Sequence, residues 1–390
     1  MRRYINKLTE AFRKADLILL LLCVVTTVFG LLIIASTTNA SAQGPLRYLG
    51  VQIGAAIAGV LAYLFFSSID TEFFSERRNV LIAFNTVALL LLVPFGTDLG
   101  TGNKSWLNFP FLPFDIQPAE VCKISFVLVM ASVMASRQNN ISSPLSIGYI
   151  IFNMILVVGL NLLVSRDMGV SLIFVFITVG MVWAGGVSIL WFLTAFAGLA
   201  LMAPLAWEFF LNDNQRKRIM VLFNPSLDPQ GTGALYHTNR ALRSLTGGGL
   251  TGQGLFQGNR TQTRGALFAQ HTDFIFAAIG EELGFLGCAV VLLLLALIVA
   301  RCIWVGNRST DYLRKLVCYG TAAALIFQIV INIGMCIGVM PVIGLTLPFI
   351  SYGGSSLITL YAMLGLVSGV YARPHPTSHE RYIRAPIQHL

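Results

Sequence analysis

An acidic residue stands at the point where a polar interval gives way to a long apolar segment. Residues 270–276 read Gln-His-Thr-Asp-Phe-Ile-Phe, and the apolar run continues to Ala300. Partial removal from water raises the pKa of a carboxyl group and neighbouring cations lower it, so Asp273 could be poised as a general base. The same position suits an N-terminal cap of a helix that begins near Phe274. Position alone leaves both roles open.

Two further ionisable residues lie inside another apolar segment. Glu120 and Lys123 follow Gln117-Pro118 and stand three residues apart, which places them on one face of a helix. Charged groups are costly within a membrane helix and usually face the protein interior or a water-filled cavity. The pair therefore either forms a structural ion pair or helps to bind a substrate.

Cations and glycines are concentrated in the polar interval before Asp273. Arg216, Lys217 and Arg218 form a cationic run that suits either phosphate recognition or snorkelling at a membrane surface. Residues 247–252 read Gly-Gly-Gly-Leu-Thr-Gly and match the dinucleotide-binding pattern. No strand is expected before them, and Asp273 would have to be the acidic residue that the pattern needs. We therefore interpret these glycines as a tight turn or as a close approach of the backbone to a ligand.

The composition places these residues in a membrane protein. Of the 390 residues, 56% are hydrophobic and 11% are charged, with a mean hydropathy of +0.75, which a water-soluble domain of this size would not tolerate. The six cysteines lie in or beside apolar runs without Cys-x-x-Cys spacing, which indicates buried free thiols and no disulfide or zinc framework. The net charge of +9 is scattered among segments that flank the apolar runs, so we expect it to orient the chain in a membrane rather than to bind nucleic acid.

The apolar runs define the fold class. A membrane helix needs about 20 apolar residues, and the block from Met168 to Trp207 is long enough for two helices separated by a turn at Gly185-Gly186. We expect an all-α polytopic membrane protein with about ten transmembrane helices, in a single membrane domain over residues 1–390. The expected helices cover Leu17–Ala35, Tyr48–Ile69, Val80–Thr97, Ala119–Ser136, Pro144–Ser165, two within Met168–Trp207, Phe274–Ala300, Leu316–Val339 and Leu345–Tyr371.

Lys and Arg residues near the helix ends predict the orientation. They gather on the side of the two termini, whereas the short loops of the other side hold Arg47, Lys104 and Arg166. Residues 1–16 and 373–390 are therefore expected in the cytoplasm. The interval 208–273, between the seventh and eighth helices, becomes a long extracytoplasmic loop, and its many basic residues call for an anionic partner.

Several strings, in order along essentially the whole chain, resemble the shape, elongation, division and sporulation (SEDS) family. Residues 116–123, Ile-Gln-Pro-Ala-Glu-Val-Cys-Lys, resemble its I-Q-P-S-E-x-x-K, and residues 104–107, Lys-Ser-Trp-Leu, resemble its basic-x-W-L string. Residues 228–231 and 247–254 follow D-P-x-G and S-G-G-L-x-G-x-G, residues 271–276 match H-T-D-F-I-F, and residues 347–356 match L-P-F-I-S-Y-G-G-S-S. The chain departs from the family pattern at Leu267-Phe268-Ala269 and at Arg166.

The resemblance implies a peptidoglycan glycosyltransferase. Such an enzyme polymerises lipid II into glycan strands at the outer face of the bacterial cytoplasmic membrane, inverting the sugar as it leaves an undecaprenyl-pyrophosphate-linked donor. Asp273 matches the family's essential aspartate and would take the proton of the attacking hydroxyl. No cofactor is certain; a divalent cation, Mg²⁺ or Mn²⁺, would suit the leaving group, but no ligand cluster in the sequence fixes a metal site. Substrate contacts are expected from Glu120, Lys123, Arg216, Arg218, His271, Thr272, Ser355 and Ser356.

The resemblance also implies partners and leaves two other classes of function open. Lipid II, a class B penicillin-binding transpeptidase and other proteins of an elongation or division complex are the expected partners. The alternatives are a transporter that flips the lipid-linked precursor and a non-catalytic scaffold that recruits wall-building enzymes. The sequence shows no internal repeat, which disfavours the transporter. The motifs do not distinguish an elongation member from a division or sporulation member.

Overall fold

The structure is a computed structural model that describes residues 14–41, 44–98, 103–109, 114–209, 213–233 and 235–374. The expected cytoplasmic segments, residues 1–16 and 373–390, lie mostly outside these ranges. Among the described residues, nine helices are long and apolar enough to cross a membrane, and a tenth apolar helix, Met168–Ala184, is slightly shorter. The expected number and class of helices are therefore confirmed.

The ten apolar helices keep the order of the expected segments. The turn at Gly185-Gly186 is confirmed, because one helix ends at Ala184 and the next begins at Ile189. The bounds are α2 (Leu17–Thr37), α3 (Gly44–Ser68), α5 (Arg78–Leu90, continued by α6, Leu92–Phe95), α7 (Pro118–Ala135), α8 (Pro144–Val164), α9 (Met168–Ala184), α10 (Ile189–Phe209), α13 (Ile275–Arg308), α14 (Tyr312–Cys336) and α15 (Gly354–Ala372).

Short elements connect these helices. The interval 208–273 contains the helices α11 (Asp213–Phe223) and α12 (Tyr236–Gly247) and a 3-10 turn, η2 (Pro225–Leu227), so it is more regular than the loop expected from its polarity. Elsewhere α4 (Thr71–Glu76) and the 3-10 turn η1 (Gln138–Asn140) join apolar helices, and β1 (Gly96–Thr97) pairs antiparallel with β2 (Trp106–Leu107).

Helix starts follow from ordinary capping chemistry. The side chains of Asp16, Ser143, Asp167 and Asp311 each accept a hydrogen bond from a backbone N–H in the first turn of α2, α8, α9 and α14. Proline, which lacks the donor that a first turn leaves unpaired, opens α7 and α8. These capping residues therefore fix the positions along the chain at which the helices begin.

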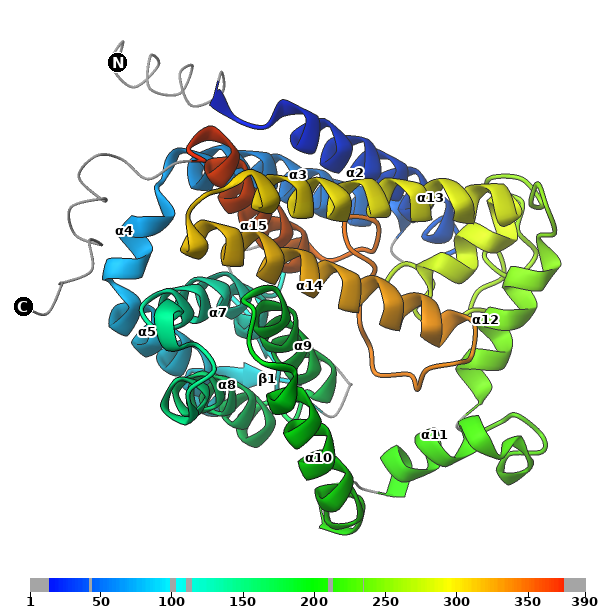
Figure 1. The fold of residues 1–390 in the computed structure, drawn as a ribbon. Helices are drawn as coiled ribbons and strands as arrows, with labels where there is room; N and C mark the ends of the chain where they lie inside the picture. Colours follow the sequence, from blue (N-terminus) through cyan, green and yellow to red (C-terminus); the bar gives the residue numbers. More distant parts are fainter. Residues whose placement is uncertain are drawn as a thin grey trace, which may run out of the picture.

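The helices pack around two apolar clusters (Figure 1). One cluster joins buried residues of α2, α3, α13 and α15, and the other joins α5, α7, α8 and α9. Because α14 and α15 contribute to both clusters, they bind the two groups of helices together. In contrast, α10 extends away from both groups and none of its apolar window is buried.

The last expected helix begins nine residues later than its hydropathy suggested. The apolar run from Leu345 was expected to be helical, but α15 begins at Gly354. Pro348 disfavours helical geometry in the residue before it, while Gly344 and Phe349 adopt positive φ angles of 75° and 65°. Residues 337–353 therefore form an irregular segment, called the 337–353 segment below, that returns toward the start of α13.

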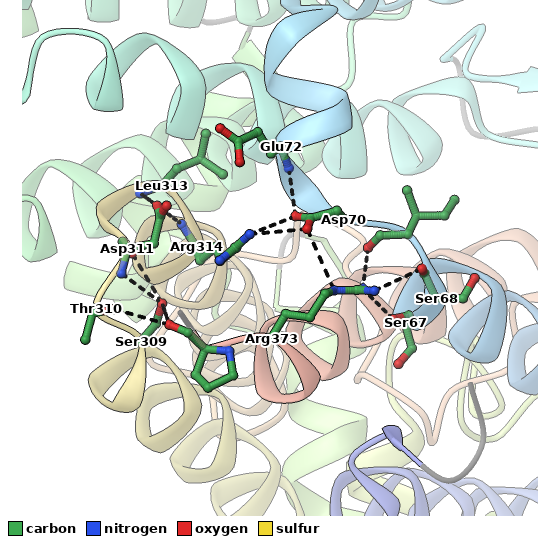
Figure 2. Close-up of polar contacts among 12 residues, drawn as sticks. Ser67, Ser68, Asp70, Glu72, Ser309, Thr310, Asp311, Leu313, Arg314 and Arg373 are labelled. Carbon is green, nitrogen blue, oxygen red and sulfur yellow. Dashed lines mark hydrogen bonds and ion pairs between the residues drawn. The ribbon is translucent and has the colours of Figure 1, made fainter. Parts of the chain in front are cut away.

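A partly buried ion pair closes the end of the bundle where α3, α14 and α15 meet (Figure 2). Nη2 of Arg314 lies 3.1 and 3.2 Å from the two carboxylate oxygens of Asp70, and Nε of Arg373 lies 3.9 Å from the same carboxylate. Arg373 also donates hydrogen bonds to the carbonyls of residues 67–69, which end α3. Through Arg314 and Arg373, Asp70 thereby links the start of α14 to the ends of α3 and α15.

Replacing Asp70 with Ala should destabilise the fold by about 3 kcal/mol, because it removes a carboxylate partner of an arginine whose side chain is 2% exposed. The matched control is Glu76→Ala, whose ion pair with Arg77 is 3.5 Å long and has side chains 49% and 64% exposed. The control should cost less than about 1 kcal/mol. Thermal unfolding of both variants in detergent checks the difference, and equal midpoints would contradict a structural role for Asp70.

Candidate active site

Asp273 lies just before α13 and is partly buried. The N-cap of α13 is Phe274, which provides no side-chain cap, and among the described residues no backbone N–H of the helix bonds to the Asp273 carboxylate. The helix-cap alternative raised by the sequence is therefore not supported. The carboxylate remains available for chemistry.

The backbone around Asp273 is fixed by the 337–353 segment. The Ser351 hydroxyl donates to the carbonyl of Thr272 at 2.6 Å, and the N–H of Tyr352 donates to the carbonyl of His271 at 2.8 Å. These two bonds join the two strings that matched most closely at the sequence level, residues 271–276 and 347–356. Thr272 thus contributes through its backbone to the position of Asp273.

Asp167 is a second carboxylate that the structure places near Asp273. It caps α9 through Val170 N at 3.1 Å and accepts a hydrogen bond from the side-chain amide of Gln117 at 3.0 Å. Burial raises its pKa, and the charge of Glu120 adds to this shift. Burial, opposed by a hydrogen bond from Thr272 and reinforced by the charge of Asp167, raises the pKa of Asp273 to about 6. Acidic groups at the starts of α7, α9 and α13 therefore influence one another.

Glu120 and Lys123 form an ion pair, one of the two interpretations that their spacing allowed. Nζ of Lys123 lies 2.7 Å from Oε2 of Glu120, and the two side chains are 0% and 5% exposed. Neither of these two atoms has a hydrogen-bond partner that meets normal geometry among the described residues. The ammonium group therefore keeps donor capacity for an anionic ligand, provided that the bundle opens to admit one.

The cationic run is divided between two places. Arg216 donates to the carbonyl of Glu208 at 2.6 Å, whereas Arg218 donates to the carbonyl of Val342 in the 337–353 segment at 2.9 Å. Burial and the charges of Arg218 and Arg240 lower the pKa of His237. Arg218, the last residue of the cationic run, therefore contacts the 337–353 segment.

His271 faces a small cavity rather than the carboxylates. Its ring packs edge-on against Tyr48 at 5.0 Å and lies 5.8 Å from Tyr352. Burial lowers its pKa, which favours the uncharged ring. The cavity has a volume of about 360 Å³ and is also lined by Arg264 and Gln270. A larger cavity of about 910 Å³ lies at the C-terminal end of α7, and no predicted site residue lines it.

Ser355 and Ser356 lie in the first turn of α15. Ser355 is buried, and the Ser356 hydroxyl is buried without a hydrogen-bond partner in the described part of the chain. Gln52 of α3 holds the residues just before them, because its amide donates to the carbonyl of Ser351 and accepts from the N–H of Gly353, each at 3.1 Å. No described contact joins either serine to Asp273, so their role in binding substrate stays a prediction.

The glycine-rich string packs against a kink in α13. Gly284 adopts φ 67°, so two helical hydrogen bonds are lost across it. The freed N–H groups of Phe285 and Leu286 bond to the carbonyls of residues 249 and 250, and the N–H groups of residues 253 and 254 bond to the freed carbonyls of Glu281 and Glu282. The string therefore approaches a helix backbone closely, where the sequence had suggested a turn or a ligand.

Buried carboxylates tie the same loop to α2. Both Glu281 and Glu282 are fully buried, and Glu282 accepts hydrogen bonds from Ser36 at 2.7 Å, Thr261 at 2.6 Å and Gln262 at 3.1 Å. The D-P-x-G string is also structural, because the Asp228 carboxylate accepts three backbone N–H groups before α12. These motifs therefore shape the 208–273 interval that precedes Asp273.

Two residues in contact with the site were missed by sequence reasoning. Asp167 follows Arg166, where the chain departs from the family pattern, but neither Asp167 nor Asn332 of α14 was singled out. The side-chain amide of Asn332 donates to the Asp273 carbonyl at 2.8 Å and to the Leu345 carbonyl at 2.6 Å. A buried polar residue inside an apolar helix was the available signal. In the described part of the chain no three His, Cys, Asp or Glu side chains form a metal-binding group, so a divalent cation stays a prediction and no step is assigned to it.

Comparison with known proteins identifies the family of this chain. The family model FTSW_RODA_SPOVE, described as "Cell cycle protein", matches residues 16–374. The peptidoglycan glycosyltransferase MrdB of Escherichia coli (strain K12) is 31% identical over 324 residues, which cover 82% of this chain and 84% of that protein.

Two solved structures share the fold. A chain in a structure described as "Structural coordination of polymerization and crosslinking by a peptidoglycan synthase complex" has a TM-score of 0.76 and 28% identity, with 92% of this chain and 97% of that chain covered. The rod shape determining protein RodA of Thermus thermophilus has a TM-score of 0.67 and 26% identity, with 92% and 97% covered. With its ordered motifs, its ten apolar helices and these matches, the chain belongs to the FtsW/RodA/SpoVE family, the SEDS family that its sequence resembles.

Proposed function

We propose that this protein is a peptidoglycan glycosyltransferase of the bacterial cytoplasmic membrane that polymerises lipid II, with Asp273 as its general base. The observation that carries the assignment is the state of the Asp273 carboxylate. It caps no helix among the described residues, and its pKa is raised to about 6. A base with a pKa near the working pH combines a deprotonated ground state with useful proton affinity. Relatives named as peptidoglycan glycosyltransferases support the reaction class.

The proposed reaction joins a sugar hydroxyl to the anomeric carbon of an undecaprenyl-pyrophosphate-linked donor. Asp273 accepts the hydroxyl proton as the new C–O bond forms, and the bond to the pyrophosphate oxygen breaks on the opposite face with inversion. Negative charge then grows on the leaving pyrophosphate. Arg218, Arg216 and Lys123 are the cations proposed to offset it, since preorganised positive charge is most effective where water is excluded. A lipid-linked donor also explains why the base lies at the end of a membrane helix.

The ion pair of Glu120 and Lys123 bears on the transporter alternative. A polar path through the bundle and a contact of Lys123 with pyrophosphate would each need this pair to open, because the two side chains bind each other and are nearly inaccessible. The decisive experiment is to purify the protein with a class B penicillin-binding transpeptidase and supply labelled lipid II without another polymerase. Glycan polymer is expected. Movement of lipid II across vesicles without polymer would indicate the transporter, and neither activity would indicate a scaffold.

A transpeptidase and other elongation or division proteins are proposed partners. A solved structure that resembles this chain is described as a synthase complex that coordinates polymerization and crosslinking. The motifs of this chain include none for peptide crosslinking, so we propose that a partner supplies that step. Close packing of small residues, rather than hydrophobicity, would hold a single-pass partner helix against the bundle.

The orientation follows from the positive-inside pattern and places both termini in the cytoplasm with the 208–273 interval outside. Ser226, in the short turn η2, is exposed and suits a single-cysteine probe in a cysteine-free variant. Cysteine at position 226 should react with an impermeant maleimide on intact cells. Protection that persists until the membrane is broken would reverse the proposed orientation.

A further inference from the structure

Asn332 connects the proposed base to the segment that covers it. The residue lies one turn before the end of α14 and is 0% exposed. Its side-chain nitrogen donates to the main-chain carbonyl of Asp273 at 2.8 Å and to that of Leu345 at 2.6 Å. Both partners are carbonyl oxygens, which can only accept, so the amide orientation is determined by its neighbours.

The two carbonyls belong to different parts of the chain. Asp273 precedes α13, and its carbonyl takes no part in the first turn, because the N–H of Ala277 bonds to Phe274 instead. Leu345 lies in the 337–353 segment, next to Gly344, where an added methyl group would lie 3.6 Å from Oδ2 of Asp273. The amide of Asn332 therefore holds both the backbone of Asp273 and the backbone of the 337–353 segment beside the Asp273 carboxylate.

The side-chain oxygen of Asn332 indicates which of its interactions matter. Oδ1 is buried and has no hydrogen-bond partner among the described residues. A buried acceptor without a donor costs stability, and an apolar side chain of similar size would avoid that cost. The two donated bonds are thus the contribution that distinguishes Asn from Leu at this position. These two hydrogen bonds fix the position of the backbone, because each is accepted by a main-chain carbonyl.

We propose that Asn332 is a positioning residue for glycan polymerisation, which aligns the main chain of Asp273 and keeps the 337–353 segment over its carboxylate. The inference rests on the proposed role of Asp273 as the base. Asn332 touches no substrate in this proposal. Its effect reaches the reaction through the placement and the hydration of one carboxylate.

The test compares Asn332→Leu with Asn153→Leu in the purified protein bound to its transpeptidase. Asn153 is also a buried asparagine of a membrane helix, but its amide donates at 2.8 Å to Tyr149 of its own helix. Asn332→Leu should lower kcat by about 100-fold, the scale of a misplacement of about 1 Å, with KM for lipid II changed by less than about twofold. Asn153→Leu should retain wild-type kcat.

The pH profile separates positioning from a loss of folded protein. With the covering segment released, water should reach Asp273 and its pKa should fall from about 6 toward the ordinary value, so the acid limb of the rate should move to lower pH. Reduced folding would lower the rate at every pH and leave the midpoint unchanged. If Asn332→Leu does not fold, Asn332→Gln provides the same readout, since it keeps the amide but displaces it by one methylene.

Asp273→Asn is measured beside these variants. Wild-type kcat and pH midpoint in Asn332→Leu, with Asp273→Asn inactive, would overturn the positioning role and leave the base intact. A lower rate in Asn332→Leu that matches its folded fraction, with an unchanged midpoint, would also overturn it. Full activity of Asp273→Asn would overturn the base itself and, with it, this role for Asn332.

Discussion

Asp273→Asn should reduce glycan polymerisation by about 100-fold or more while the protein still folds and binds its transpeptidase. Asparagine has the size of aspartate but cannot accept the proton of an attacking hydroxyl at neutral pH. Because the Asp273 carboxylate caps no helix among the described residues, the substitution removes no cap bond. The measurement is lipid II polymerisation by the purified complex, with thermal unfolding to confirm that the variant is folded.

The wild-type pH profile gives an independent check on the same residue. The active form of a base is the deprotonated form, and burial raises the pKa of Asp273 to about 6. The rate should therefore be high above pH 6 and fall as the pH decreases through about 6, rather than through the ordinary value near 4. Asp273→Glu should recover little activity, because one added methylene displaces the carboxylate. A near wild-type rate in Asp273→Asn would refute the assignment.

Gly252→Ala should unfold the junction between the glycine-rich string and α13, at a cost of about 3 kcal/mol or more. Gly252 has φ 81°, and an added Cβ would lie 2.1 Å from the carbonyl oxygen of Glu282. The string would have to move away and abandon the hydrogen bonds that replace those lost at the Gly284 kink. We expect a lower unfolding midpoint and a loss of polymerisation, since the loop leads directly to Asp273.

Gly249→Ala is the matched control for this prediction. Gly249 lies in the same string with φ 57°, but no atom lies within 4 Å of an added Cβ. Its substitution should cost only the strain of a left-handed alanine, about 1 kcal/mol. Measuring both unfolding midpoints separates close packing from backbone strain. Equal effects of the two substitutions would contradict the contact with α13.

Hydropathy predicted the ten helices because every helix that crosses lipid needs a long run of apolar residues. The ends of the helices depend instead on local sequence chemistry. The pair Gly185-Gly186 was readable as a break, but the delayed start of α15 required the positive φ angles of Gly344 and Phe349, which hydropathy does not report. The helices of the 208–273 interval were missed because hydropathy identifies only strongly apolar segments. The helix α12 is polar overall, but its apolar residues lie on one face, so helical periodicity was the signal that could have found it.

The candidate site was predictable where neighbours in sequence are also neighbours in space. Glu120 and Lys123 are three residues apart and form an ion pair, which was one of the two interpretations of their spacing. Asp167 and Asn332 lie far along the chain from Asp273, so their influence on it appears only once α9, α13 and α14 are packed. The position of Asp273 at a boundary was visible, but position could not decide between a cap and a base. The described structure shows no cap bond from Asp273, so the cap interpretation is not supported, while the role of Asp273 as a base stays a prediction.

The pairing of Glu120 with Lys123 within one helix also affects how the chain enters the bilayer. A lone charge costs about 3 kcal/mol at the centre of an inserting helix and less near its end, and Glu120 and Lys123 lie in the first two turns of α7. Because both partners belong to α7, their charges can neutralise each other before any other helix has arrived to shelter them. Changing either residue alone would therefore burden membrane insertion as well as the finished protein, whereas removing both would leave α7 easier to insert than a helix with a single charge.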